Sequence, residues 1–228
     1  MPWSWDGKTA VATMRSWKCS WVPSHPEAGL GPIQRASENP SRLRPLQLLW
    51  EPESGRHVLG ETYIRESEFH VSYSAASRNK LHRRIVLRIL RDDHLQVDGL
   101  EVVIHTHTDL LDSNPLITSH TTSDPGVTLR SYATSAWKEL PCNPPDAISL
   151  SPPDPGLFLI RDLTSHSYVE MVLPSDFRGA RIEQSTGESS ISYPMFTPGL
   201  EKGVIRMGRI RCYWVPCGHD LETAERLF

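Results

Sequence analysis

The sequence predicts an all-β protein, an antiparallel β-sandwich or barrel of about ten to twelve short strands with long polar or proline-rich loops. Short runs of residues alternate between apolar and polar side chains, and clusters of turn residues separate these runs roughly every 8–12 residues. The 19 prolines leave room for short helices at most. All-β domains of this length are often single, so we expect one β-rich domain over residues 1–228.

Two similar stretches of ten residues lie near the two ends of the chain. Residues 14–23 read MRSWKCSWVP, and residues 207–216 read MGRIRCYWVP. Because a strand alternates its side chains between two faces, the same apolar face occurs in both copies. That face comprises Trp17, Cys19, Trp21, Ile210, Cys212 and Trp214. We expect both faces in the core and both strands at equivalent places in one sheet structure, where a side-by-side arrangement would close it.

The first half of the chain is assigned in order. Residues 23–45 lack periodicity and predict a long surface loop, and residues 46–50 form a short apolar run. A turn follows at residues 52–55. Residues 57–74 alternate as one strand, with Phe69 among its inward side chains.

The next segments give the clearest strand patterns. A turn at residues 74–80 leads to a strand at residues 84–90, whose inward side chains are Ile85, Leu87 and Ile89. Residues 95–109 are strongly strand-like, but the pair Asp98-Gly99 within them is a typical turn signal. We therefore expect a turn to interrupt this strand.

The second half begins with a polar stretch at residues 112–126. Residues 127–137 predict a strand, which could instead end in a helical turn at residues 135–140. Residues 141–155 carry six prolines and predict a linker or an extended surface arm. The remaining elements are strands at residues 157–163, 168–173, 179–184, 191–196 and 203–215, and a short helix at residues 220–228.

Charge and composition limit the functional classes. The formal net charge of −3 gives no bulk attraction to nucleic acid or to acidic membranes. No stretch approaches about 18 consecutive apolar residues, and the N-terminal residues lack a signal-peptide pattern. The four cysteines do not form a pair of CxxC motifs. We therefore expect a soluble, cytoplasmic protein without a transmembrane segment, whose cysteines are reduced.

One run of residues suggests a metal site. In the run VIHTHTD, residues 103–109, an apolar strand ends in His105, His107 and Asp109, whose side chains point to one face. This HxHxD pattern resembles the strand-end motif of the metallo-β-lactamase family over seven residues, although that family's next histidine is Leu110 here. The resemblance implies a divalent metal ion held by these three residues. No other cofactor is expected.

Basic residues form two candidate binding surfaces. The first is a basic patch of Arg78, Lys80, Arg83 and Arg84, and the second is a stripe of Arg206, Arg209 and Arg211. Such surfaces can bind phosphate groups, so nucleic acid is a candidate partner. The alternative is a solvated hairpin and a charged edge strand that prevents strand pairing with other chains.

The aromatic side chains can line either a core or a cavity. The candidates are Trp17, Trp21, Tyr73 and Trp214. A cavity lined by aromatic rings and a few polar groups is typical of small-molecule sites.

Three functional classes follow from these features. The leading expectation is a non-enzymatic structural or interaction protein, a self-assembling or partner-binding β-sandwich like those of viral coat, matrix and movement proteins. Its partner would be a second copy or another protein. One alternative is a small-molecule-binding β-barrel with isomerase or cyclase activity. The other is a metal-dependent hydrolase that uses His105, His107 and Asp109.

Overall fold

The protein consists almost entirely of antiparallel strands, as the sequence predicts. The computed structural model describes residues 2–35, 43–50, 57–75, 81–124, 127–133, 135–141, 147–161, 165–184 and 187–228. Within these ranges there are twenty strands, one α-helix and two short 3₁₀ helices, η1 (Pro26–Ala28) and η3 (Cys217–His219). No helix in the described ranges has the length and apolar character needed to cross a bilayer.

The largest sheet has nine strands in the order β13-β12-β15-β16-β20-β9-β8-β7-β6. Each of its two edge strands pairs with one neighbour, so the sheet is open, and the sandwich form of the prediction applies rather than the barrel. In chain order its strands are β6 (His57–Arg65), β7 (Glu68–Ala75), β8 (Leu81–Asp92), β9 (Val97–Thr108), β12 (Thr128–Ala133), β13 (Ala136–Glu139), β15 (Gly156–Arg161), β16 (His166–Val172) and β20 (Ile205–Pro216).

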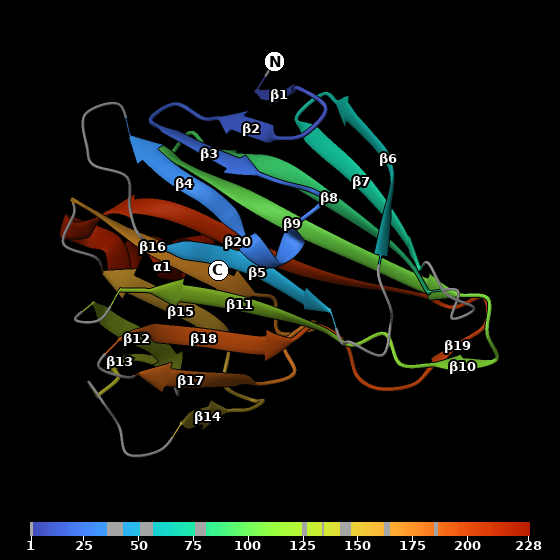
Figure 1. Cartoon of the computed structure of the whole chain (residues 1–228). Coiled ribbons are helices and arrows are strands. Elements are labelled where there is room, and N and C mark those ends of the chain that lie inside the picture. The colour runs from blue at the N-terminus through green and yellow to red at the C-terminus, as the bar shows by residue number, and fades with distance from the viewer. Residues whose placement is uncertain are drawn as a thin grey trace.

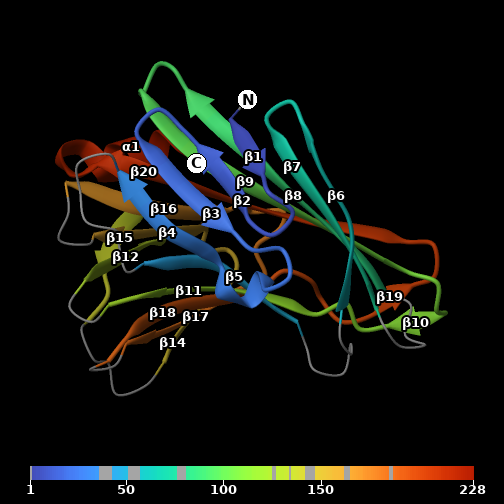
Figure 2. The same cartoon turned by 45° about the horizontal axis from the view of Figure 1, so that its top comes forward.

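Two smaller sheets lie together on one side of the large sheet (Figure 1), and the tilted view shows the same arrangement (Figure 2). The four-stranded sheet runs in chain order through β1 (Trp3–Trp5), β2 (Ala10–Thr13), β3 (Trp17–Trp21) and β4 (Leu30–Arg35). The five-stranded sheet has the spatial order β14 (Ile148–Leu150), β17 (Ala180–Gln184), β18 (Ser189–Pro194), β11 (Ile117–Ser123) and β5 (Arg44–Trp50). A short separate pair joins β10 (Asp112–Ser113) to β19 (Leu200–Glu201).

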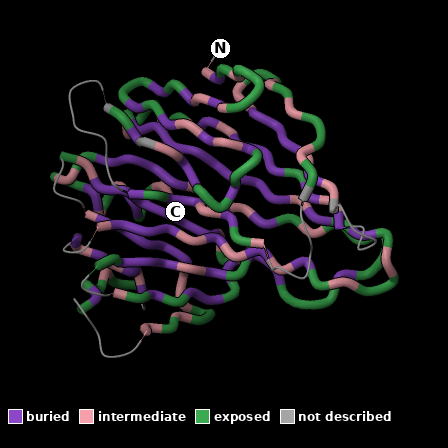
Figure 3. Tube along the Cα trace, in the orientation of Figure 1, coloured by how far each residue is buried: buried purple, intermediate pink, exposed green. Residues whose placement is uncertain are grey.

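The main hydrophobic core lies between the large sheet and the two smaller ones. We call the side of the nine-stranded sheet that faces them its inner face. Aromatic pairs join the layers across this core: Trp3 with Phe69, Trp17 with Trp214, and Phe158 with Tyr193. The buried segments of all three sheets are visible along the chain in Figure 3. Burial of these large rings is the principal stabilising term of the sandwich.

The opposite, outer face of the large sheet is covered at one end by the helix α1 (Asp220–Leu227). Ala224 of the helix packs into a second apolar cluster with residues of β15, β16 and β20, among them Leu159, Val169 and Val215. The helix was expected from the sequence at this position. Away from this cluster, the outer face carries many polar and charged side chains.

The two similar end strands are both buried on the predicted faces, but they do not close one sheet. Cys19 and Cys212 are 2% and 0% exposed. However, β3 belongs to the four-stranded sheet, whereas β20 pairs with β9 and β16 and has no free edge for a third partner. The two strands meet instead across the core, where the rings of Trp17 and Trp214 stack at 5.8 Å.

Several expected loops and single strands contain additional strands. The expected loop at residues 23–45 contains β4, and the polar stretch at residues 112–126 contains β10 and β11. The single strands expected at 57–74 and 127–137 are each folded into hairpins, β6–β7 and β12–β13. The strands in the expected loops were missed because many of their residues are polar. The hairpins were read as single strands because a tight turn lets the alternation of apolar and polar residues continue from one strand to the next.

The turn expected at Asp98-Gly99 is absent from the structure, because β9 runs unbroken through both residues. Gly99 instead allows β9 and β20 to approach closely. A Cβ atom there would lie 2.3 Å from the carbonyl oxygen of Cys212 and 2.5 Å from Cδ1 of Tyr213. The glycine is therefore required by the packing of β9 against β20.

We expect Gly99→Ala to lower the free energy of unfolding by about 1–3 kcal/mol, because the added methyl group must push a backbone carbonyl and an aromatic ring aside. Urea denaturation measures this change. Gly218→Ala is the matched control, since a Cβ atom at Gly218 meets nothing within 4 Å. An unchanged denaturation midpoint for Gly99→Ala would contradict this packing.

Candidate functional site

A group of ionisable side chains lies together on the outer face of the nine-stranded sheet. We call it the outer-face cluster; its members are Tyr63, Glu68, His70, Arg84, Arg88, Glu101, His105 and Arg211. The antiparallel register places Glu68, Arg88, Glu101 and Arg211 in one row across four strands. It also places Arg84 directly opposite His105. The cluster therefore follows from strand pairing between distant parts of the sequence.

The row of alternating charges is closely bonded. Arg88 Nε lies 2.7 Å from Glu68 Oε1, and Arg88 Nη1 lies 2.8 Å from Glu101 Oε2. Arg211 Nε lies 2.8 Å from Glu101 Oε1, so the buried Glu101 carboxylate is held between two guanidinium groups. Burial raises the pKa of Glu68, but the hydrogen bond and charge of Arg88 outweigh it and hold that pKa below its usual value. The four side chains therefore hold one another in a fixed row on this face.

His70 is buried beside this row, and its tautomer follows from its neighbours. Arg84 Nη2 lies 2.9 Å from His70 Nδ1, and a guanidinium group can only donate, so Nδ1 accepts and the proton is on Nε2. That Nε2 lies 2.8 Å from Glu68 Oε2 but is not aligned as a hydrogen bond. Burial, followed by the Arg84 charge, lowers the pKa of His70 and keeps the ring neutral at pH 7.

An aromatic ring covers this imidazole from the neighbouring strand. The ring of Tyr63 stacks on His70 with centroids 4.6 Å apart and planes 9° from parallel. Tyr63 is 40% exposed. Its hydroxyl also accepts a hydrogen bond from Arg84 Nη2. The cluster thus offers an exposed aromatic surface next to a guanidinium group.

His105 is the member of the cluster best placed for proton transfer. It is half-buried, and its side chain makes no hydrogen bond or ion pair with any residue of the described ranges. Burial lowers the pKa of His105, and the charge of Arg84 lowers it further. A neutral imidazole in this position can accept a proton at neutral pH.

The three residues of the expected metal site all lie on the outer face but are engaged separately. His105 is beside Arg84, whereas the ring of His107 stacks on His82 at 4.7 Å. Asp109 Oδ2 lies 3.4 Å from His82 Nε2. Among the described residues, no three or more His, Cys, Asp or Glu side chains are arranged to hold a metal ion. A divalent ion at His105, His107 and Asp109 stays a prediction, which metal analysis of the purified protein would test.

The expected basic patch is divided by the alternation of strand β8. Arg84 is exposed on the outer face, but Arg83 is 2% exposed on the inner face, with its guanidinium 4.8 Å from the ring centre of Trp50. Burial lowers the pKa of Arg83 to about 10. Arg83 therefore does not belong to a surface patch. Arg78 and Lys80 lie outside the described residues.

The second arginine stripe is likewise divided between two faces of β20. Arg206 Nη1 donates to the carbonyl oxygen of Thr197 at 2.6 Å. Arg209 Nε lies 3.3 Å from Asp176 Oδ2, and Arg211 pairs with Glu101 as described above. Carboxylates therefore partly neutralise Arg209 and Arg211, which reduces their attraction for phosphate. Nucleic-acid binding through these strands stays a prediction.

The candidate aromatic residues lie in the core rather than around an open cavity. Trp17, Trp21, Tyr73 and Trp214 are 7%, 2%, 3% and 4% exposed. The hydroxyl of Tyr73 donates to the carbonyl oxygen of Pro23 at 2.8 Å. These side chains stabilise the sandwich and do not form the candidate site.

Sequence reasoning missed Glu68, His70 and Glu101. The alternation that puts Phe69 and its inward neighbours in the core puts Glu68 and His70 on the opposite face, so this signal was available. Glu101 is in an apolar strand, where a lone carboxylate signals a buried partner. The partners themselves could not be found, because they depend on which strands pair.

The fold was compared with known proteins. The search against protein-family models found no match, and the search of curated proteins found none either. Solved structures do match. Galactose 1-epimerase from Lactobacillus acidophilus NCFM is 9% identical with a TM-score of 0.57, over 93% of this chain and 96% of that one. A Klebsiella pneumoniae protein described as an aldose 1-epimerase is also 9% identical with a TM-score of 0.57, over 98% and 84%.

A part of a larger enzyme also has this fold. The α-N-acetylgalactosaminidase NagBb from Bifidobacterium bifidum, in complex with GalNAc, is 11% identical with a TM-score of 0.54. The match covers 99% of this chain but 37% of that one. The leading expectation of a viral coat, matrix or movement type of structural protein is wrong, because the two structures above, which match over most of their length, are described as epimerases. The chain shares the fold of these sugar epimerases.

Proposed function

We propose that the protein binds a small sugar on the outer face of its nine-stranded sheet and acts on it as an isomerase, an aldose 1-epimerase. The observation that carries the proposal is the pair of His105 and Arg84, a neutral imidazole without a described partner next to a guanidinium group. The likeness to two sugar 1-epimerases over most of the chain supports the substrate class.

The reaction requires proton transfer but no change in oxidation state. A base removes the proton from the hydroxyl group on C1 while an acid protonates the ring oxygen, so the C1–O5 bond breaks and an aldehyde forms. Rotation about C1–C2 and return of O5 to the other face of the carbonyl group close the ring as the second anomer. Both proton transfers then run in reverse. A positioned acid or base typically accelerates such a step by about 10²–10⁴-fold.

The outer-face cluster supplies a base and a group that stabilises negative charge. In this proposal His105 accepts the proton from the C1 hydroxyl, and the Arg84 guanidinium stabilises the negative charge that develops on O5 as the C1–O5 bond breaks. O5 then takes its proton from water at this exposed face. The free face of the Tyr63 ring offers a surface for the apolar face of a sugar. His70 holds Arg84 and Tyr63 in place, and Glu68 contacts His70 in turn, which makes both of them positioning residues.

The test is the rate at which α-D-galactose or α-D-glucose converts to its β-anomer, followed by NMR and compared with the spontaneous rate. We expect an enzymatic excess that falls about a hundredfold in His105→Ala. Because the pKa of His105 is lowered from its ordinary value of 6.5, the excess should fall as the imidazole becomes protonated, with a midpoint below pH 6.5.

The matched control is His107→Ala, two residues along the same strand face. His107 is exposed and stacks on His82 rather than lying beside Arg84, so its replacement should leave the rate unchanged. Thermal melting of both variants distinguishes a loss of chemistry from a loss of fold. An absence of any rate excess, together with no sugar-dependent chemical-shift change, would contradict the proposal.

We also propose a cytoplasmic location. Cys19 and Cys212 are buried free thiols in the core, which supports a compartment that keeps thiols reduced. Self-association or a protein partner stays a prediction, and size-exclusion chromatography with light scattering is its test.

A further inference from the structure

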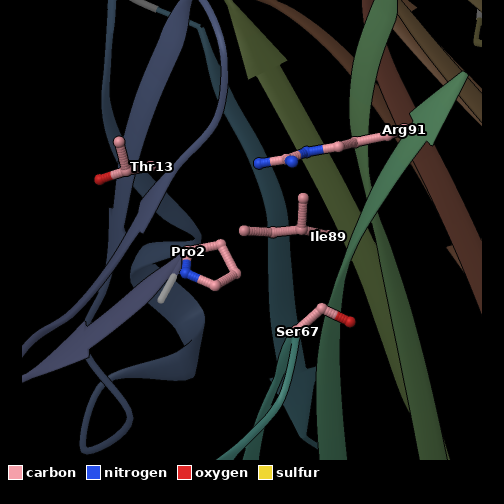
Figure 4. Close-up of a pocket in the computed structure, with 5 residues that line it drawn as sticks. All are labelled: Pro2, Thr13, Ser67, Ile89 and Arg91. Carbon is pink, nitrogen blue, oxygen red and sulfur yellow. The ribbon is translucent and has the colours of Figure 1, made fainter. Parts of the chain in front are cut away.

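A separate pocket lies on the inner side of the large sheet, where the four-stranded sheet meets the ends of β7 and β8 (Figure 4). Its volume is about 550 Å³, and the described residues that line it are Pro2, Thr13, Ser67, Ile89 and Arg91. Pockets of this volume accommodate small organic molecules. None of these five side chains belongs to the outer-face cluster.

The pocket contains a cation that has no counter-charge within the described residues. Arg91 is paired in register with Asp98 on the neighbouring strand, but the Asp98 carboxylate contacts Arg15 instead. Asp98 Oδ2 accepts a hydrogen bond from the Arg15 backbone N–H at 2.6 Å, and Asp98 Oδ1 lies 3.7 Å from Arg15 Nε. The exposed Arg91 side chain instead extends into the pocket, as Figure 4 shows.

The walls beside this cation are apolar. The Pro2 ring and the Ile89 side chain face each other across the space next to the guanidinium group (Figure 4). The Ser67 carbonyl oxygen accepts hydrogen bonds from Trp3 Nε1 at 2.9 Å and from the Ile89 backbone N–H at 3.2 Å. These bonds tie the four-stranded sheet to the β6–β7 turn. The pocket is therefore formed by the fold itself.

We propose that this pocket binds a small organic anion, with the anionic group on Arg91 and an apolar body between Pro2 and Ile89. A guanidinium group binds carboxylate and phosphate through paired N–H donors, so both groups fit the shared chemistry. Thr13 and Ser67 complete the lining. None of the described lining side chains exchanges a proton at neutral pH, which makes this a binding site distinct from the proposed catalytic one.

The test uses the full chain and three probes in calorimetric titrations: cyclohexanecarboxylate, the neutral cyclohexanemethanol, and inorganic phosphate. We expect saturable binding of cyclohexanecarboxylate that weakens at least about tenfold in Arg91→Gln. Cyclohexanemethanol should bind far more weakly. The Trp3 indole N–H signal should shift on binding, because Trp3 is bonded to the pocket turn.

Phosphate distinguishes the two sources of the anion. Competition by phosphate would show that Arg91 accepts any oxyanion, whereas binding without competition would assign the site to carboxylates. The matched control is Arg226→Gln on the helix α1, an exposed arginine far from the pocket in sequence and on the outer side, which should bind as the unaltered chain does. Binding that is unchanged in Arg91→Gln, or no saturable binding of either anion, would overturn the proposal.

Discussion

Replacement of Trp214 by alanine should lower the free energy of unfolding by about 3–5 kcal/mol. Trp214 is 4% exposed at the centre of the nine-stranded sheet. Its ring stacks on Trp17 at 5.8 Å and lies 5.8 Å from the ring of Tyr168. The substitution removes the contact that joins β20 to β3 and leaves a cavity that the surrounding strands cannot fill. Urea denaturation followed by far-ultraviolet circular dichroism measures the loss.

A residue of the same strand provides the control. Ile205 is 66% exposed at the start of β20, so Ile205→Ala should change the free energy of unfolding by less than about 1 kcal/mol. A loss of this small size for Trp214→Ala would mean that the indole is not held between the sheets as described.

Replacement of Glu170 by alanine should also cost about 3–5 kcal/mol, for a different reason. Glu170 is fully buried on the inner face of β16. Its Oε2 accepts hydrogen bonds from Thr121 Oγ1 at 2.7 Å and from the Tyr168 hydroxyl, and its Oε1 accepts one from the Tyr193 hydroxyl. Alanine leaves three buried hydroxyl groups without their acceptor, and each unsatisfied group costs roughly 1–3 kcal/mol.

The same carboxyl group should make stability depend on pH. Burial raises the pKa of Glu170, although its three hydrogen bonds act in the opposite direction. Above the ordinary value of 4.5 the unfolded chain loses this proton while the folded chain retains it. The stabilising contribution of Glu170 is therefore complete below pH 4.5 and is lost as the pH rises through the folded-state pKa.

The variant Glu170→Gln isolates this effect, because an amide cannot ionise and has nearly the same volume. Its free energy of unfolding, measured against that of the unaltered chain from pH 4.5 to pH 8, should become relatively higher as the pH rises. A constant difference over this range would show that Glu170 has an ordinary pKa in the folded protein.

Local patterns predicted individual strands well where burial alternates strictly. The inward set of β8 and the indole and thiol faces of β3 and β20 follow directly from period two, since a strand with one buried face must place its apolar residues there. The pattern failed for β11, whose buried side chains include Ser119 and Thr121. These small hydroxyl side chains fit between sheets, but in the sequence they resemble a loop.

The turn signal at Asp98-Gly99 failed because another strand lies beside it. Asp98-Gly99 has the composition of a turn, yet Gly99 is needed because Cys212 and Tyr213 of β20 pass too close for a side chain. A glycine required by close approach and a glycine required by a turn are identical in sequence. They differ only in what lies beside them.

The sequence by itself determined that the chain forms antiparallel strands, which faces of β3, β8 and β20 are buried, and where the C-terminal helix lies. The tertiary structure decided that β3 faces β20 across the core, that Arg84 lies opposite His105, and that Glu101 lies between two arginines. The physical reason is the separation along the sequence of the residues that interact. Side-chain alternation depends on neighbouring residues, whereas the pairing of strands depends on contacts between segments far apart in the sequence, such as β9 and β20.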